Sequence, residues 1–310
     1  MTSEKIKEWA FIINPIAGNN YAKTLVPKIE SEIDKHKISA SILFTERKGH
    51  ATELSELAIK DGAKYIVSVG GDGTLNEIAR TMIGNNDVVL GVIPAGTGND
   101  FIQILGFPNR FEENHWDIFF EKNITKLDAG SSNGVPFFNG MGLGFDAEVA
   151  AQNYTGEGEL VRKGGKDKYI WHIVKTLLFF KEQKMIAISD NDRHEEQCFM
   201  NTISIGRRYA AGFFITPKAI ANDGLFDICM VKKINLFNRF RILLMVPKGT
   251  HTEDKYVNYY RSEKVNLEFT KAVHFHVDGE LYKASKFEVK IIKNAINAIY
   301  NPKGNHYLTI

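Results

Sequence analysis

The stretch that most constrains the fold is the glycine-rich segment 70–74, Gly-Gly-Asp-Gly-Thr. It follows an apolar, β-branched run at 65–69, which predicts a buried strand, and it precedes apolar residues at helical spacing over 75–83. A strand, a glycine turn and a helix N-terminus form an anion site, because free backbone N–H groups and the positive end of the helix dipole face one point. Asp72 would repel a phosphate there unless a cation lies between them or a hydroxyl binds it, which favours a metal-bridged nucleotide.

Two further predicted strands end in loops of the same kind. The run at 88–93 leads into the loop 94–101, and the run at 11–13 leads into the loop 14–19, both rich in glycine and asparagine. In an open parallel sheet the carboxyl ends of the strands share one edge, where ligands bind. One glycine-rich turn is weak evidence, because many are ordinary strand–helix connections. Three such loops at one edge predict a ligand site.

The order of predicted elements divides the chain into two domains. Over residues 1–127 strands alternate with helices, which predicts a Rossmann-like α/β domain with a parallel sheet. Over residues 128–299 short, glycine-spaced apolar runs with turn signals predict an antiparallel β-sandwich interrupted by two helices. We expect the last residues, 300–310, to return to the first domain.

Composition restricts the partners and the compartment. The formal net charge is +2, without the concentrated basic face that a nucleic-acid-binding protein needs. Cys198 and Cys229 lie in strand-like runs and are expected to be buried thiols in a reducing compartment. The charged N-terminus lacks an apolar signal core, and the apolar runs are too short to span a bilayer. We therefore expect a cytoplasmic protein that associates transiently with a membrane surface, if it visits one.

Two Asp-Gly pairs in the second half of the chain could bind a metal ion or take part in catalysis, or they could form simple turns. Asp223 and Gly224 precede an apolar run, where a carboxylate and nearby carbonyls could hold Mg²⁺ or the pair could be plain turn chemistry. Asp278 and Glu280 follow another strand-like run, and taken alone they indicate a hairpin. If both carboxylates reach a cleft at the phosphate edge, one could accept a hydroxyl proton.

Basic and aromatic residues are interleaved over 161–181, around the first predicted helix of the second domain. A solvated helix face is the commoner explanation of such charge. The alternative is an amphipathic helix that contacts a membrane through aromatic anchors. The basic residues are Arg162, Lys163, Lys166, Lys168, Lys175 and Lys181, and the aromatic ones include Tyr169, Trp171, Phe179 and Phe180.

Five motifs together resemble the diacylglycerol kinase catalytic family, the bacterial soluble lipid kinases related to sphingosine and ceramide kinases. The glycine motif alone is shared with NAD kinases and phosphofructokinase-like folds, so the specificity lies in the joint occurrence. The motifs follow in order along nearly the whole chain: Asn14-Pro15 with Gly18, 70–77, 94–101, 222–226 and 277–280.

The resemblance implies an N-terminal nucleotide domain of the phosphofructokinase and NAD kinase type, a C-terminal β-sandwich, and ATP between them. The implied reaction transfers the γ-phosphoryl group of ATP, with Mg²⁺, to a lipid hydroxyl such as that of diacylglycerol at a membrane surface. A homodimer is left open. By this likeness the residues that bind ATP are Asn14, Thr45, Gly70, Gly71, Asp72, Gly73, Thr74, Leu75, Asn76, Thr97 and Asp100.

The same likeness assigns the carboxylates. Asp278 and Glu280 would be catalytic, with Asp278 taking the proton late, and Asp72 would hold Mg²⁺–ATP or order the site. A second, structural Mg²⁺ would lie on Asp223 and the main-chain carbonyls of Ile220 and Leu225. This chain has Asn-Asp at 222–223 where some relatives carry two acids, which weakens that metal assignment.

Two alternatives remain open. A NAD kinase would share the first motif and the two-domain plan but use a soluble acceptor; the segment 161–181 and the end of the loop 94–101 favour a lipid. A non-catalytic lipid or nucleotide sensor on the same fold would be indicated by loss of Asp72 or of the 278/280 pair, and all three acids are present.

Overall fold

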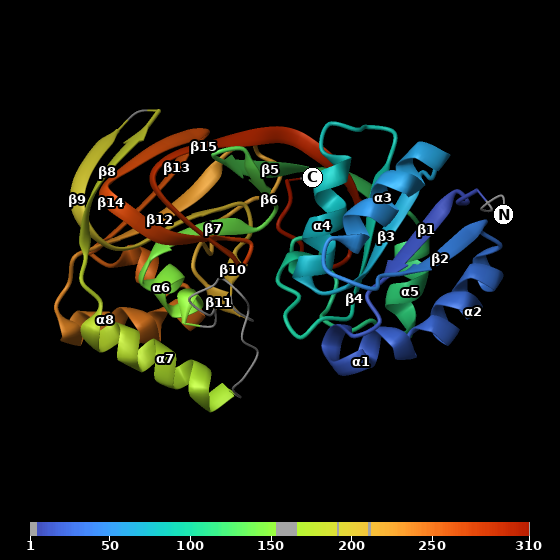
Figure 1. The fold of residues 1–310 in the computed structure, drawn as a ribbon, viewed down its shortest axis with the longest axis horizontal. Helices are drawn as coiled ribbons and strands as arrows, with labels where there is room; N and C mark the ends of the chain where they lie inside the picture. The colour runs from blue at the N-terminus through green and yellow to red at the C-terminus, as the bar shows by residue number, and fades with distance from the viewer. Residues whose placement is uncertain (1–4, 153–165, 191, 210–211, 310) are drawn as a thin grey trace. The chain divides into compact units, whose positions relative to one another are not determined.

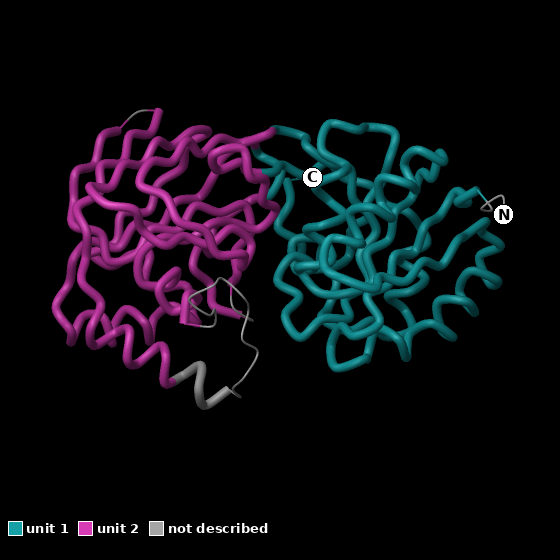
Figure 2. The backbone as a smooth tube through the Cα atoms, in the orientation of Figure 1, with its two compact units in different colours: residues 1–129, 221–223, 293–310 teal, residues 130–220, 224–292 magenta. Residues whose placement is uncertain are grey.

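The structure is a computed structural model that describes residues 5–152, 166–190, 192–209 and 212–309. The chain folds into two compact units (Figure 2). Unit 1 comprises Met1–Ala129, Ala221–Asp223 and Lys293–Ile310, and unit 2 comprises Gly130–Ile220 and Gly224–Ile292. The structure divides the chain after Ala129, two residues later than the sequence predicted. Residues 293–299, which were predicted to lie in the second domain, belong to unit 1.

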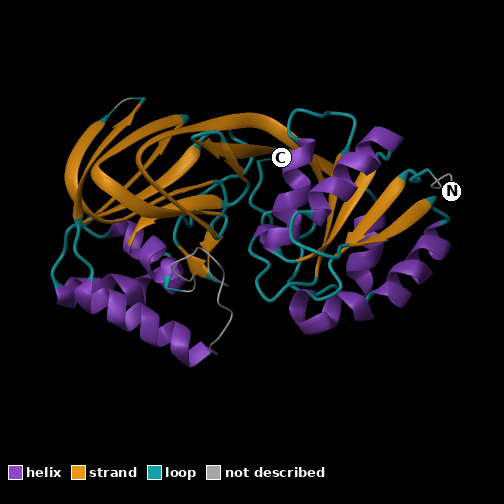
Figure 3. Ribbon diagram, viewed as in Figure 1, coloured by secondary structure: helices purple, strands orange, loops and turns teal. Residues whose placement is uncertain are grey.

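Unit 1 is built on a parallel sheet with strand order β2–β1–β3–β4 and the C-terminal part of β15 beside β4. Helices lie on both faces of it (Figures 1 and 3), which confirms the predicted α/β class. The strands are β1 Trp9–Ile13, β2 Ala40–Phe44, β3 Tyr65–Gly70, β4 Val89–Pro94 and β15 Glu280–Ile299. The helices are α1 Ala17–Thr24, α2 Val26–His36, α3 His50–Asp61, α4 Asp72–Met82, η1 Phe101–Gln103 and α5 Glu113–Phe120.

The core of unit 1 explains the continuous apolar runs of its strands. Every residue of β1 is buried, as expected for a parallel strand covered on both faces. Phe11, Val67 and Gly91 are in register across three strands. The glycine makes room for α5, since a Cβ there would lie 2.7 Å from the ring of Phe119.

Unit 2 is an antiparallel sheet with strand order β13–β12–β9–β7–β14–β15. β8 pairs with both β9 and β14, and β5 pairs with β6. The strands are β5 Ile124–Ser132, β6 Val135–Phe137, β7 Gly140–Gly144, β8 Gln183–Ser189, β9 Arg193–Ser204, β10 Arg208–Tyr209, β11 Phe213–Phe214, β12 Phe226–Lys232, β13 Val257–Ser262 and β14 Lys264–Val277. The helices are α6 Phe145–Ala151, α7 Lys166–Phe179, α8 Leu236–Met245, η2 Val246–Lys248 and η3 Thr250–Glu253.

The helices of unit 2 pack on one apolar cluster against the sheet. Phe145 of α6, Leu177 of α7 and Ile242 of α8 contribute to it together with Cys229 of β12. Both cysteines are buried free thiols, as predicted, and burial raises the pKa of Cys229 to about 12. Within the described ranges, the structure contains no helix with the length and apolar character needed to cross a membrane.

Candidate nucleotide-binding and catalytic site

The three predicted loops follow adjacent strands of unit 1. β4, β3 and β1 are neighbours in the sheet, so the loops after residues 94, 70 and 13 lie side by side at its carboxyl edge. The amides of Ala95 and Gly96 donate to the Gly70 carbonyl at 2.8 and 3.0 Å. The Asn14 side chain donates to Thr74 Oγ1 at 3.1 Å. The three loops therefore form one connected surface.

Close glycine contacts hold the loops together. A Cβ on Gly96 would lie 2.4 Å from Gly71 Cα, and a Cβ on Gly18, where φ is +58°, would lie 2.2 Å from the Ala95 carbonyl oxygen. These glycines are required by the packing of one loop on another. Gly73 differs, because no described atom lies within 4 Å of a Cβ built there. Its open side is where a ligand could approach the backbone.

Asp72 is the first residue of α4, whose N-cap is Gly71. The N-cap residue is a glycine and makes no side-chain capping bond to the helix N-terminus. The Asp72 carboxylate accepts hydrogen bonds from the amides of Asp100 and Phe101 at 3.2 and 3.3 Å. Burial raises the pKa of Asp72 above its usual value, and the two amides oppose that rise. The carboxylate thus joins the first glycine loop to the end of the second.

The remaining predicted nucleotide residues differ in exposure. Thr97 is exposed at the tip of its loop, and Thr45 follows β2, where its amide donates to the Ile13 carbonyl at 2.9 Å. Leu75 and Asn76 are buried within α4, and the Leu75 amide donates to the Gly71 carbonyl at 3.1 Å. All of them lie at the same sheet edge or in the first turns of α4.

Two charged residues at this edge were not predicted from the sequence. The Arg110 guanidinium donates to the carbonyls of Pro94 and Gly96 at 3.3 and 3.2 Å and stacks over the Tyr21 ring at 4.1 Å. Glu77 of α4 accepts from the amides at the start of α3 at 2.9 and 3.2 Å. Arg110 belongs to none of the five motifs, and Glu77 ends the motif 70–77 without having been assigned a role, so their contacts emerge only from the tertiary structure.

The Asp278–Gly279 pair forms the two-residue turn between β14 and β15, closed by the pairing of Val277 with Glu280. Both turn residues have positive φ, +46° and +87°, as a type I′ turn requires. The hairpin interpretation of the backbone is therefore correct. It does not exclude a chemical role for either side chain.

The carboxylate of Asp278 anchors the start of β7. It accepts hydrogen bonds from the amides of Phe138, Asn139 and Gly140 at 2.7, 3.0 and 2.9 Å. Three backbone N–H groups thus bind both oxygens of this carboxylate. Glu280 is half-buried, and its Oε2 accepts from the Tyr282 hydroxyl at 3.0 Å. The two carboxylates that the sequence treated as a pair thus have different hydrogen-bond partners.

Two histidines precede this turn on β14 and meet acids of α6. His274 Nδ1 lies 2.8 Å from Glu148 Oε1, and His276 Nε2 lies 3.3 Å from Asp146 Oδ2. No local pattern in the sequence links either histidine to its acidic partner. Their acidic partners lie more than a hundred residues earlier in the chain.

The predicted second metal site falls on the loop before β12. Asp223 and Gly224 form a bend rather than a hairpin turn. The preceding Asn222 is tied to the C-terminal tail, since its side chain donates to the Thr309 carbonyl at 3.0 Å and accepts from the Thr309 amide at 2.8 Å. One carboxylate and two main-chain carbonyls are hard oxygen donors of the kind Mg²⁺ takes. The assignment of a Mg²⁺ ion to Asp223 and the carbonyls of Ile220 and Leu225 stays a prediction.

Two helices of unit 2 expose large apolar side chains. α7 and α8 lie side by side (Figure 1). The Arg239 guanidinium of α8 donates to the Leu177 and Phe180 carbonyls at 2.6 and 3.0 Å. Arg162 and Lys163 of the predicted basic segment lie outside the described residues. We define the α7/α8 apolar face as the exposed residues Trp171, Val174, Leu178, Phe179, Leu236, Phe237, Phe240 and Leu244.

Comparisons with known proteins agree with this arrangement. Residues 8–132 match the family described as the diacylglycerol kinase catalytic domain, and residues 140–300 match the YegS C-terminal NAD kinase beta sandwich-like domain. A diacylglycerol kinase of Staphylococcus haemolyticus is 27% identical over 87% of this chain and 81% of its own. One of Staphylococcus aureus is 28% identical over 88% and 86%.

Solved structures show the same fold. A diacylglycerol kinase crystal structure from Bacillus anthracis superposes with a TM-score of 0.74 at 18% identity, over 97% of this chain and 99% of its own. The chain belongs to the diacylglycerol kinase family of enzymes, with its catalytic domain followed by a YegS-type β-sandwich domain.

Proposed function

We propose that this enzyme transfers the γ-phosphoryl group of Mg²⁺–ATP to the hydroxyl of a membrane lipid of the diacylglycerol class. The observation that carries the proposal is the edge of the unit 1 sheet. There, a helix N-terminus without a side-chain cap, an open glycine and a carboxylate lie together at residues 71–73. Backbone N–H groups at such a position bind phosphate oxygens.

The residues at this edge fit a metal–nucleotide complex. Asp72 would face Mg²⁺ through lone pairs that the two amides leave available, and Asn14, Thr45 and Thr97 would contact the nucleotide. When bound, Mg²⁺ neutralises phosphate charge during phosphoryl transfer. Arg110 keeps the loop 94–101 in place through its two carbonyl contacts.

The proton of the lipid hydroxyl needs an acceptor as its oxygen bonds to the γ-phosphorus and the bond to ADP breaks. We assign this role to Glu280 rather than to Asp278. Three backbone amides already bind both oxygens of the Asp278 carboxylate, and that carboxylate positions the turn that carries Glu280. Both acids thus remain in the proposed mechanism, with different roles.

A phosphotransfer assay tests the proposal. Radiolabelled ATP is supplied with diacylglycerol, monoacylglycerol, phosphatidylglycerol, sphingosine or NAD. Label in the diacylglycerol product supports the proposal, and its absence together with label in NAD would favour the soluble-acceptor alternative. Asp72→Asn should abolish transfer. It should also lower Tm, because an amide side chain can accept only one of the two N–H bonds.

We further propose that the enzyme reaches its lipid through transient contact of the α7/α8 apolar face with the membrane surface. Phe237 and Leu244 are 75% and 77% exposed. Exposed apolar side chains that gather on a surface mark protein or membrane interaction sites. Lys175 lies over the Trp171 ring at 5.2 Å, which places a cation beside an aromatic anchor.

Vesicle co-sedimentation tests the membrane contact, with phosphatidylcholine vesicles that contain phosphatidylglycerol. Burial of one Phe or Leu contributes at least about 1.5 kcal/mol, so replacing Phe237 and Leu244 together by Ser should weaken binding by about 100-fold. Ile188→Ser is the matched control, because Ile188 is 43% exposed on β8, outside this face. Equal binding by the double variant and the control would refute the proposed face.

A further inference from the structure

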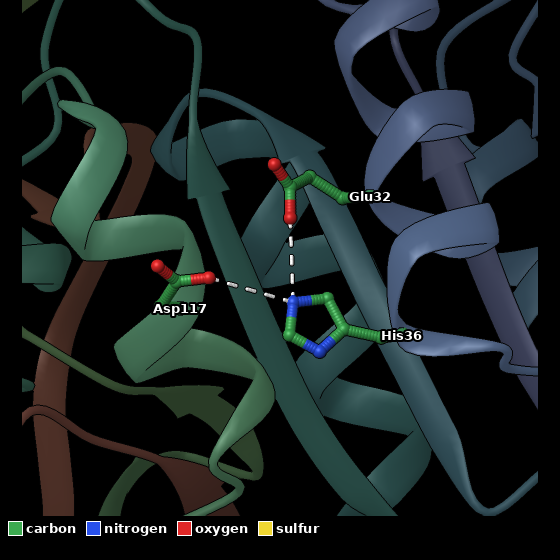
Figure 4. Close-up of side chains that lie close together, drawn as sticks. All are labelled: Glu32, His36 and Asp117. Atoms are coloured by element: carbon green, nitrogen blue, oxygen red, sulfur yellow. Dashed lines mark ion pairs between the residues drawn. The ribbon is translucent and has the colours of Figure 1, made fainter.

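Three side chains of unit 1 outside the nucleotide edge converge on one point (Figure 4). Glu32 and His36 lie one turn apart on α2, and Asp117 projects from α5. Glu32 Oε2 lies 3.3 Å from His36 Nε2, and His36 Nε2 lies 3.7 Å from Asp117 Oδ1. All three ligand atoms lie within 4.8 Å of one another.

Burial makes this cluster unusual. Glu32 is 1% exposed, and neither its Oε2 nor His36 Nε2 has a hydrogen-bond partner among the described residues. A buried polar atom without a partner destabilises the folded state, because it has lost its hydrogen bonds to water. The two atoms lie 3.3 Å apart, so one cation could accept a lone pair from each of them.

The spacing matches the ligand sphere of a small cation. Zinc binds imidazole nitrogen and carboxylate oxygen at about 2.0–2.2 Å in tetrahedral geometry, which puts neighbouring ligand atoms about 3.4 Å apart. The distances from His36 Nε2 to Glu32 Oε2 and to Asp117 Oδ1, 3.3 and 3.7 Å, are close to that ligand–ligand distance. One imidazole and two carboxylates select a zinc-type ion over Mg²⁺, which prefers oxygen ligands.

The geometry points to a divalent-cation site of the zinc type formed by Glu32, His36 and Asp117, with a fourth position open to water. By binding residues of both helices, the ion cross-links α2 and α5 on the face of the sheet that α5 covers. Stacking of the His36 ring on Phe120, with centroids 4.5 Å apart, already orients the imidazole for it. The site is separate from the proposed reaction, and its role is to stabilise unit 1.

Lysines satisfy part of the charge of this cluster. Lys28 Nζ lies 2.7 Å from Glu32 Oε1, and Lys35 Nζ lies 3.5 Å from Glu32 Oε2, the oxygen that we assign to the ion. Lys35 Nζ lies 2.6 Å from Asp117 Oδ1, the oxygen that faces His36, so the ion must displace this ammonium. Lys35 is 46% exposed, and an exposed ion pair contributes little to stability, so the ion can displace this ammonium.

The test is zinc binding by the full chain, after treatment with a chelator and in the presence of excess Mg²⁺. Calorimetry should find one zinc ion per chain, and zinc should raise Tm. His36→Gln and Asp117→Asn should each weaken zinc binding by about 100-fold or more, since losing even an outer-shell partner costs 10–100-fold. Asp117 is 53% exposed, so its variant should fold.

Two further variants separate a metal site from a plain ion-pair network. Lys35→Met should tighten zinc binding, because it removes the competing ammonium. Glu113→Gln, which removes an acid that pairs with Lys28 outside the cluster, should leave zinc affinity unchanged. Absence of stoichiometric binding, or wild-type affinity in both His36→Gln and Asp117→Asn, would overturn the site.

Discussion

The two acids of the β14–β15 hairpin should respond differently to removal of their charge. Asp278→Asn leaves one acceptor oxygen where the carboxylate used both, Oδ2 for the Phe138 amide and Oδ1 for the amides of Asn139 and Gly140. At least one N–H then faces an amide NH₂. Hydrogen bonds to a charged acceptor are worth about 1.5–3 kcal/mol, so stability should fall by about that amount.

The thermal shift follows from the size of the domain. For a domain of 150–250 residues, 1 kcal/mol moves Tm by about 2–4 °C, so Asp278→Asn should lower Tm by about 3–12 °C. Glu280→Gln should leave Tm near wild type, because an amide oxygen can still accept from the Tyr282 hydroxyl. It should lower kcat by about 10²–10⁴-fold, the usual cost of losing a proton acceptor.

Calorimetry and steady-state kinetics on the same preparations decide between the roles. ATP affinity should stay near wild type in Glu280→Gln, since the proposed nucleotide residues lie elsewhere in the chain. Unchanged Tm with complete loss of turnover in Asp278→Asn would show that Asp278 itself is the proton acceptor. Full activity in Glu280→Gln would remove Glu280 from the chemistry.

Local sequence signals were sufficient to predict the strands that form the proposed nucleotide edge. The runs at 65–69 and 88–93 became β3 Tyr65–Gly70 and β4 Val89–Pro94, because buried parallel strands are apolar along their whole length. α4 begins at Asp72, three residues before the first apolar residue of its periodic pattern. Periodicity detects the buried face of a helix, whereas its N-cap depends on the backbone of Gly71.

Long-range contacts account for what the sequence did not predict. The amides that bind Asp278 lie about 140 residues earlier, and no short-range pattern encodes such a pairing. β15 runs from Glu280 to Ile299, whereas only short apolar runs were expected over residues 128–299. The alternating pattern is interrupted near Asn294, which has φ of +52° within that strand.

Further predictions concern the glycines and a buried acid. Gly96→Ala should lower Tm, because its Cβ would press on the Gly71 backbone at 2.4 Å; Gly73→Ala, with open space around it, should keep Tm and weaken ATP binding measured by calorimetry. Asp227, fully buried and hydrogen-bonded by Tyr259, has its pKa raised from 3.8 to about 6 by burial. Its proton is held more tightly in the folded state, so this contribution to stability is complete below pH 4 and is lost as pH rises to about 6. The loss amounts to at most about 3 kcal/mol. Chemical unfolding between pH 4 and 7 should show this decline in wild type and a flatter profile in Asp227→Asn, whereas equal slopes in both proteins would mean that Asp227 titrates normally.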